Sequence, residues 1–147
     1  MKKIYLDVCT LCRPFDDQNY LRIRMETDAY FLIMDRIQKK QYELIISPVH
    51  HSDVNSINDL YEKYQLLALF EKYSKMPKIN LPEAKNRTIE LNRKKFGLAD
   101  AAHISFAEQS AEVFISCDDK LIKKCRKESL KIKVYNPIEF CMEEEIK

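Results

Sequence analysis

Short runs of apolar residues alternate with longer segments of helical periodicity along almost the whole chain. The first run, residues 4–6, is followed by a stretch over residues 18–40 in which apolar side chains recur at helical spacing. Runs at 44–46, 113–115 and 132–135 are each followed by another helical segment. Strands separated by helices need crossover connections, which give a parallel sheet covered on both faces. The sequence therefore predicts one α/β domain over residues 1–147, with three layers (α/β/α) and a central parallel sheet of four or five strands.

The helices between these strands are marked by their apolar spacing and by helix-breaking residues. An apolar pattern from Ile57 to Ala68 predicts a helix that ends at Met76-Pro77, because proline cannot continue a helix. Gly97 is expected to end the helix before it, since glycine favours the position after a helix C-terminus. The remaining helices are expected over residues 83–95, 100–109 and 118–127, and from residue 137 onward.

The composition excludes several classes of protein. With a single glycine in 147 residues, the chain has no Gly-rich loop of the kind that holds nucleotide phosphates. A net charge of +2 neither demands nor excludes a nucleic-acid partner. No apolar run approaches the ~18 residues of a membrane span, and the start of the chain lacks the apolar stretch of a signal peptide. We therefore expect a cytoplasmic protein with no membrane partner, whose five cysteines are free thiols.

Four aspartates stand where apolar runs give way to a turn or to the start of a helix. Asp7 directly follows the first strand, Asp53 follows Ser47-Pro48 after the second, Asp100 opens a later helix, and Asp118 follows the third strand. In open parallel sheets, ligands bind outside the carboxyl ends of the strands. Carboxylates brought together there would repel one another unless a cation neutralised them, and oxygen ligands suit Mg²⁺ or Mn²⁺. The sequence therefore favours a metal-dependent hydrolase.

Each aspartate also has a structural interpretation. Asp100 and Asp118 could cap helix N-termini, and Asp53 could be an ordinary exposed helix residue. Asp7 is harder to explain in this way, because a carboxylate that ends an apolar strand is costly to desolvate without a partner.

The order and spacing of these residues resemble those of the PIN-domain ribonucleases, including VapC-like proteins. The resemblance rests on Tyr5-Leu6-Asp7, on Asp53 after Ser47-Pro48-Val49, on Leu98-Ala99-Asp100-Ala101-Ala102-His103 and on Ser116-Cys117-Asp118. The segment Arg13-Pro14-Phe15-Asp16-Asp17 also resembles a PIN subgroup with Arg-Pro-Phe-Asp-Asp after the first strand. Two positions depart from the family pattern, since Asp53 stands where Glu is usual and Cys9 where Asn is frequent.

This resemblance implies an endoribonuclease that uses Mg²⁺ or Mn²⁺, often the toxin of a toxin–antitoxin pair. Its partners would be an RNA substrate and an antitoxin protein. Separately, the long apolar helices could supply the surface of a homodimer, which the sequence does not distinguish from core. Asp7, Asp100 and Asp118 would bind the metal. Asp53 would complete the catalytic set, either by binding the metal through a water or by orienting the nucleophile. Ser116 and His103 are predicted to support the ligands by hydrogen bonds, and Asp119 is an alternative to Asp118. Arg13 is the candidate for contact with RNA.

Other signals are weaker. Cys9-Thr10-Leu11-Cys12 has the spacing of a redox motif, but it is a lone pair without further metal ligands. His103 follows Asp100 by three residues, so it could be a metal ligand, although we favour a hydrogen-bonding role. Lysines and arginines cluster at residues 85–95 and 120–127, either as solvated helix faces or as contacts for an RNA backbone.

Three rival functions follow from the same residues. A PIN-like module that binds RNA or protein with a weakened site is motivated by Asp53 and Cys9. A phosphoacceptor receiver domain is disfavoured because Asp7 stands alone after the first strand, where receivers carry paired acids. A dehalogenase-type phosphatase would need a second Asp at the position that Cys9 occupies.

Overall fold

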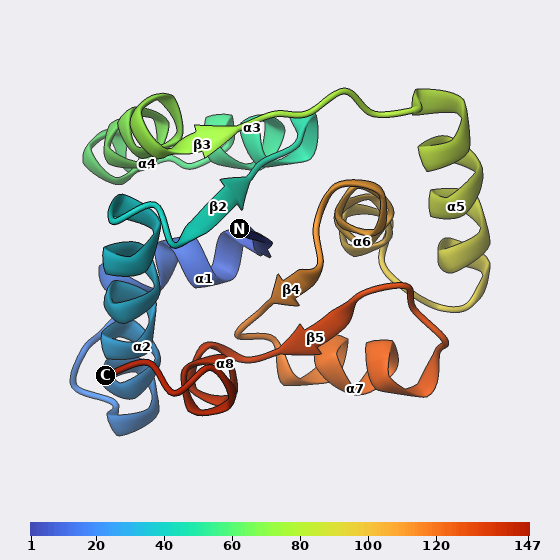
Figure 1. Cartoon of the computed structure of the whole chain (residues 1–147). Coiled ribbons are helices and arrows are strands. Elements are labelled where there is room, and N and C mark those ends of the chain that lie inside the picture. The colour runs from blue at the N-terminus through green and yellow to red at the C-terminus, as the bar shows by residue number, and fades with distance from the viewer.

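The computed structural model describes residues 1–147 and is built on one sheet of five parallel strands (Figure 1). The strand order is β3-β2-β1-β4-β5, so β1 lies at the centre and pairs with β2 on one side and β4 on the other. This confirms the predicted α/β fold. The strands are β1 (Lys2–Leu6), β2 (Tyr42–Ile45), β3 (Ser74–Lys75), β4 (Val113–Ile115) and β5 (Lys133–Tyr135).

Helices cover the sheet on both faces, as expected for crossover connections. The long α2 and the C-terminal α8 lie together on one side of the sheet, and α5 packs along α6 on the other (Figure 1). The helices are α1 (Val8–Cys12), the 3₁₀ helix η1 (Arg13–Phe15), α2 (Leu21–Gln38), α3 (Pro48–Asn55), α4 (Leu60–Tyr73), α5 (Leu81–Arg93), α6 (Leu98–Ser110), α7 (Asp119–Lys127) and α8 (Pro137–Glu143).

The two faces of the sheet carry two apolar clusters, because successive side chains of a strand point to opposite faces. On β1, Ile4 and Leu6 join the cluster beneath α2 and α8, whereas Tyr5 joins the cluster beneath α5, α6 and α7. Phe140 of α8 and Ile104 of α6 are fully buried in the first and second cluster, respectively. Both faces of the sheet are therefore buried, as parallel sheets require.

Several boundaries differ from the predictions for local reasons. The helix expected to begin at Ile57 begins at Leu60, because Asp59 caps its N-terminus by accepting a hydrogen bond from the backbone of Glu62. That helix ends at Tyr73 and is followed by β3, a two-residue strand that the sequence did not predict. Gly97 does not end a helix, since it is the N-cap of α6 with φ −61°. Lys95 instead takes the positive φ, 72°, beyond the end of α5.

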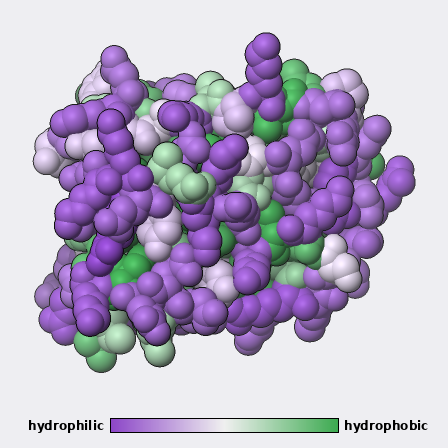
Figure 2. Space-filling view, in the orientation of Figure 1, coloured by the Kyte–Doolittle hydropathy of each residue, from purple (hydrophilic) through white to green (hydrophobic).

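The outside of the molecule is mainly hydrophilic on the face shown in Figure 2, where apolar atoms form separate patches between charged side chains. No helix is both long enough and apolar enough to cross a bilayer. The carboxyl ends of β1, β2 and β4 lie next to one another, since Tyr5 pairs with Ile45 and Leu6 with Ile115. The residues that follow these strands are consequently neighbours, whatever their separation in the sequence.

Candidate active site

Asp7 lies at the point where the central strand β1 ends and α1 begins. Its side chain is 7% exposed and caps α1, with Oδ1 accepting a hydrogen bond from the backbone N–H of Val8 at 2.8 Å. Oδ2 accepts from the Ser116 hydroxyl at 2.9 Å and from the Cys9 thiol at 3.4 Å. The carboxylate is therefore fixed between β1 and the loop that follows β4.

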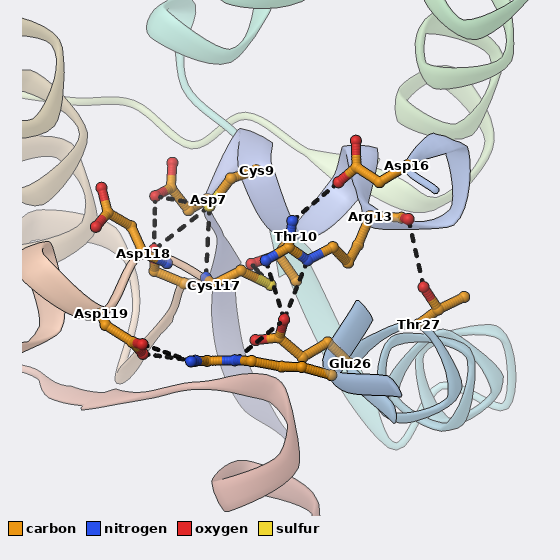
Figure 3. Close-up of polar contacts among 12 residues, drawn as sticks. Asp7, Cys9, Thr10, Arg13, Asp16, Glu26, Thr27, Cys117, Asp118 and Asp119 are labelled. Atoms are coloured by element: carbon orange, nitrogen blue, oxygen red, sulfur yellow. Dashed lines mark hydrogen bonds and ion pairs between the residues drawn. The ribbon is translucent and has the colours of Figure 1, made fainter. Parts of the chain in front are cut away.

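Asp118 is held in the same neighbourhood by the loop after β4. It caps α7 through Oδ1, which accepts from the backbone N–H groups of Lys120 and Leu121 at 3.0 and 3.2 Å. Its own backbone N–H donates to Ser116 Oγ at 3.0 Å. Ser116 thus connects Asp7 to Asp118, and Figure 3 shows the two aspartates side by side. The N-cap interpretation of Asp118 is correct, and it leaves the second carboxylate oxygen without a protein partner.

Asp100 lies in the first turn of α6 and is half-buried, with no hydrogen bond to its carboxylate. Burial raises the pKa of this carboxyl above its ordinary value, and the negative charges of Asp7 and Asp118 raise it further. The nearby Lys124 offsets part of this increase. The charges of Asp7 and Asp118 therefore reach the Asp100 carboxyl.

Asp53 lies on α3 and is bonded differently from the other three aspartates. Its Oδ2 lies 2.7 Å from Nε2 of His103, and its side chain is 35% exposed. It is not an isolated surface residue, and it connects α3 to α6. The structure therefore places Asp53 beside His103, three residues along α6 from Asp100.

Asp119, the alternative to Asp118, turns toward α2. Its two carboxylate oxygens accept hydrogen bonds from Arg22 at 2.5 and 2.6 Å, and this pairing lowers the pKa of Asp119. Figure 3 shows its side chain directed away from Asp7. Of the two neighbours, Asp118 is the one whose charge reaches Asp100.

Solved structures with the same architecture match nearly the whole chain. A chain of FitAcB from Neisseria gonorrhoeae matches with a TM-score of 0.53 and 15% identity, over 91% of this chain and 97% of that one. A chain of VapBC2 from Rickettsia felis, in a complex with a DNA fragment from their promoter, matches with a TM-score of 0.56 and 14% identity. The match covers 91% of this chain and 98% of that one. A chain of FitAB bound to an IR36 DNA fragment matches with a TM-score of 0.55 and 17% identity, over 92% of this chain and 95% of that one. The fold is PIN-like.

This PIN-like fold is what the resemblance of the sequence motifs implied. At identities of 14–17%, the likeness shows the fold and does not extend to the chemistry. No family model matches the chain, and no curated protein matches it either.

The acidic side chains at the carboxyl edge of the sheet offer oxygen atoms only. No group of three or more His, Cys, Asp or Glu side chains is arranged in this structure so that it could hold a metal ion. Yet none of the carboxylates of Asp7, Asp100 and Asp118 is paired with a lysine or arginine, and burial and the charges of Asp7 and Asp118 raise the pKa of Asp100. Asp100 and Asp118 retain oxygens that no protein group uses. Oxygen ligands with uncompensated negative charge are what Mg²⁺ and Mn²⁺ bind.

Arg13, the predicted RNA contact, is engaged in ion pairs near α2. It donates through Nε to Glu26 Oε1 at 3.1 Å and through Nη1 to Asp16 at 3.0 Å, and its side chain is 21% exposed. Contact with RNA stays a prediction for this residue. Sequence reasoning missed Glu26 and Arg22, which join the same network, although a charged residue in the apolar stripe of α2 was a visible signal.

The cysteines and histidines lie largely inside the protein. All five cysteines are free thiols, as expected, and the backbone of Cys117 donates to Cys9 Sγ at 3.4 Å. His103 is 2% exposed and His50 is fully buried. Burial lowers the pKa of His50 to about 3, so this ring is neutral at physiological pH.

Proposed function

We propose that this protein is a divalent-metal-dependent endoribonuclease that hydrolyses RNA phosphodiester bonds. The observation that carries the proposal is that Asp7, Asp100 and Asp118 have no ion pair, while burial and the charges of Asp7 and Asp118 raise the pKa of Asp100. Without a bound cation, unpaired carboxylates near one another destabilise the folded state. The PIN-like fold supports the same function, because the group lies where ligands bind in parallel sheets.

In this proposal each residue has a task at the carboxyl edge of the sheet. Asp7, Asp100 and Asp118 would hold Mg²⁺ or Mn²⁺. Ser116 holds Asp7 and Asp118 beside each other, because its hydroxyl bonds to the Asp7 carboxylate and to the backbone N–H of Asp118. When bound, the ion would supply Lewis-acid chemistry, polarising the scissile phosphate and lowering the pKa of water. Asp53 would accept a hydrogen bond from the attacking water and orient it.

We further propose that the protein is the toxin of a toxin–antitoxin pair and has a protein antitoxin as its partner. This part rests on the PIN-like fold and on the likeness to the FitAcB and VapBC2 chains. It is tested by co-purification with the product of an adjacent gene, which should bind the toxin and inhibit RNA cleavage.

The nuclease proposal is tested by measuring Mn²⁺ binding by calorimetry and cleavage of a single-stranded RNA for three proteins. Wild type should bind Mn²⁺ and cleave RNA, and chelation with EDTA should stop cleavage. Asp7→Asn should lose both properties. Asp35→Asn is the matched control, since the side chain of Asp35 on α2 is 48% exposed and pairs only with Lys39.

The rival function is a PIN-like module that binds RNA or protein without chemistry. It is motivated by Asp53 and Cys9, which stand where the PIN-domain ribonucleases usually have Glu and frequently have Asn. Wild type that binds RNA but neither binds Mn²⁺ nor cleaves would select this rival.

A further inference from the structure

A chain of hydrogen bonds runs from the Asp53 carboxylate into the interior of the protein. Asp53 Oδ2 lies 2.7 Å from His103 Nε2, His103 Nδ1 lies 2.6 Å from the Tyr5 hydroxyl, and that hydroxyl lies 2.7 Å from Ser47 Oγ. His103, Tyr5 and Ser47 are at most 2% exposed. The four residues come from α3, α6, β1 and the start of α3, so the chain joins three separate elements.

The direction of each hydrogen bond follows from the chemistry of its ends. An ionised carboxylate only accepts, so Nε2 of His103 carries a proton and donates to Asp53. In a neutral imidazole the other nitrogen then accepts, and Tyr5 donates to it. Since the phenol has one proton, Tyr5 must accept from Ser47. Burial raises the pKa of Tyr5 well above its ordinary value, which keeps that proton in place.

The neighbouring His50 is held by a separate set of bonds. Its Nδ1 accepts from the backbone N–H of Ser47 at 3.0 Å, and its Nε2 donates to the carbonyl of Leu6 at 2.7 Å. His50 thereby caps α3 and anchors it to the end of β1. Ser47, at the head of the chain, is fixed by the same contacts.

We propose that His103 is a positioning residue for Asp53, and that Tyr5 and Ser47 fix His103 in the tautomer that this requires. This inference rests on the proposed nuclease function. It states that buried residues fix the orientation of the Asp53 carboxylate. One oxygen of Asp53 is occupied by His103, and the other has no protein partner and is free to orient a water. Aspartate is one carbon shorter than the glutamate usual at this position in the family that the sequence resembles. The hydrogen bond from the buried His103 ring restricts the orientation of this shorter side chain.

The test replaces the Tyr5 hydroxyl without changing the ring. Tyr5→Phe leaves His103 Nδ1 without its donor, so kcat for RNA cleavage should fall by roughly 10-fold or more while KM stays unchanged. Tyr42→Phe is the matched control, because the Tyr42 hydroxyl bonds to Glu144 away from the site. His103→Gln keeps an N–H donor near the position of Nε2 and should retain more activity than His103→Leu.

A double-mutant cycle separates positioning from a loss of general integrity. If Tyr5 acts through Asp53, Tyr5→Phe should have no further effect on kcat in an Asp53→Ala background. Equal fold losses in both backgrounds, or a Tyr5→Phe protein as active as Tyr42→Phe, would overturn the inference. Thermal unfolding of each variant shows that the assays use folded protein.

Nitrogen NMR of the histidine side chains tests the same inference without activity. His103 should be in the Nε2–H tautomer, and its Nδ1 resonance should shift in Tyr5→Phe and not in Tyr42→Phe. An Nδ1–H tautomer in wild type would contradict the proposed direction. Wild type with this tautomer but with no cleavage and no Mn²⁺ binding would refute the nuclease function, and with it the positioning role, while leaving the hydrogen-bond chain intact.

Discussion

Two groups of acidic side chains lie beside each other in this protein, and they differ in what neutralises them. Asp7, Asp100 and Asp118 have no ion pair, and the charges of Asp7 and Asp118 raise the pKa of Asp100 beyond the effect of its burial. The second group, Asp16, Glu26 and Asp119, is paired with Arg13 and Arg22 (Figure 3). The comparison teaches that position alone does not identify a functional acid, since Asp118 and Asp119 are adjacent residues in different groups. What distinguishes the first group is the missing counter-charge.

The sharpest way to break this comparison is to neutralise the two adjacent aspartates separately. Asp118→Asn should lower kcat for RNA cleavage about 1,000-fold, because a site that stabilises developing charge loses a ligand. Asparagine caps helices as well as aspartate does, so the fold should be retained. Asp119→Asn should keep nearly full activity. Comparable losses in both variants, measured with the same RNA, would remove the distinction between the groups.

The second prediction concerns the stability of the compensated group. Glu26 is fully buried and accepts a hydrogen bond from Arg13. Glu26→Gln should therefore lower the free energy of unfolding by about 3 kcal/mol. This is the low end of the range for a broken buried ion pair, because both arginines are partly exposed. Urea denaturation of the variant measures this loss. Glu71→Gln, at an exposed residue of α4, is the control and should be neutral. A Glu26→Gln protein as stable as the control would show that this network contributes nothing.

The third prediction uses a metal to supply the counter-charge that the first group lacks. At a Mn²⁺ concentration of about 100 times Kd, binding to the folded state should add about 2.7 kcal/mol of stability. For a chain of this size, that raises Tm by roughly 5–10 °C. Scanning calorimetry with and without Mn²⁺ measures the shift. Asp119→Asn should show the same increase, whereas an increase retained by Asp118→Asn would place the ion elsewhere.

The smallest expected effect concerns the pH dependence of stability without metal. The folded protein raises the pKa of Asp100, so its contribution to stability is full at acid pH and is lost as pH rises through the raised pKa. Asp100→Asn in EDTA should therefore be more stable than wild type at pH 7, by less than about 1 kcal/mol because the group is only half-buried. The difference should vanish near pH 3. A variant less stable than wild type at pH 7 would indicate that Asp100 has a favourable partner.

Much of the fold could be predicted because it depends on local patterns. The runs before Asp7 and Asp118 are apolar on both sides of the strand, as a buried parallel sheet requires, and their ends mark the carboxyl edge. The helix α1 was missed because Val8–Cys12 is too short to show a periodicity. The strand β3 was missed because its two residues form a strand only by pairing with β2.

The site could be predicted only in part, for a physical reason. Asp7 and Asp118 each follow a strand, so the sequence was sufficient to place both at the carboxyl edge of a parallel sheet. That they are neighbours depends on the pairing of β1 with β4. The pairing of Arg22 with Asp119 joins α2 to α7, which depends on how the helices pack. The role of Tyr5 was also hidden, because its place in a strand predicts only burial. Its hydroxyl contact with His103 requires the tertiary structure.

The most direct measurement is the anomalous diffraction of Mn²⁺ in a crystal soaked at a concentration that saturates binding in solution. The account predicts a strong anomalous peak bounded by the carboxylates of Asp7, Asp100 and Asp118. A peak beside Glu26 and Asp119, or no peak among the three aspartates under those conditions, would contradict it.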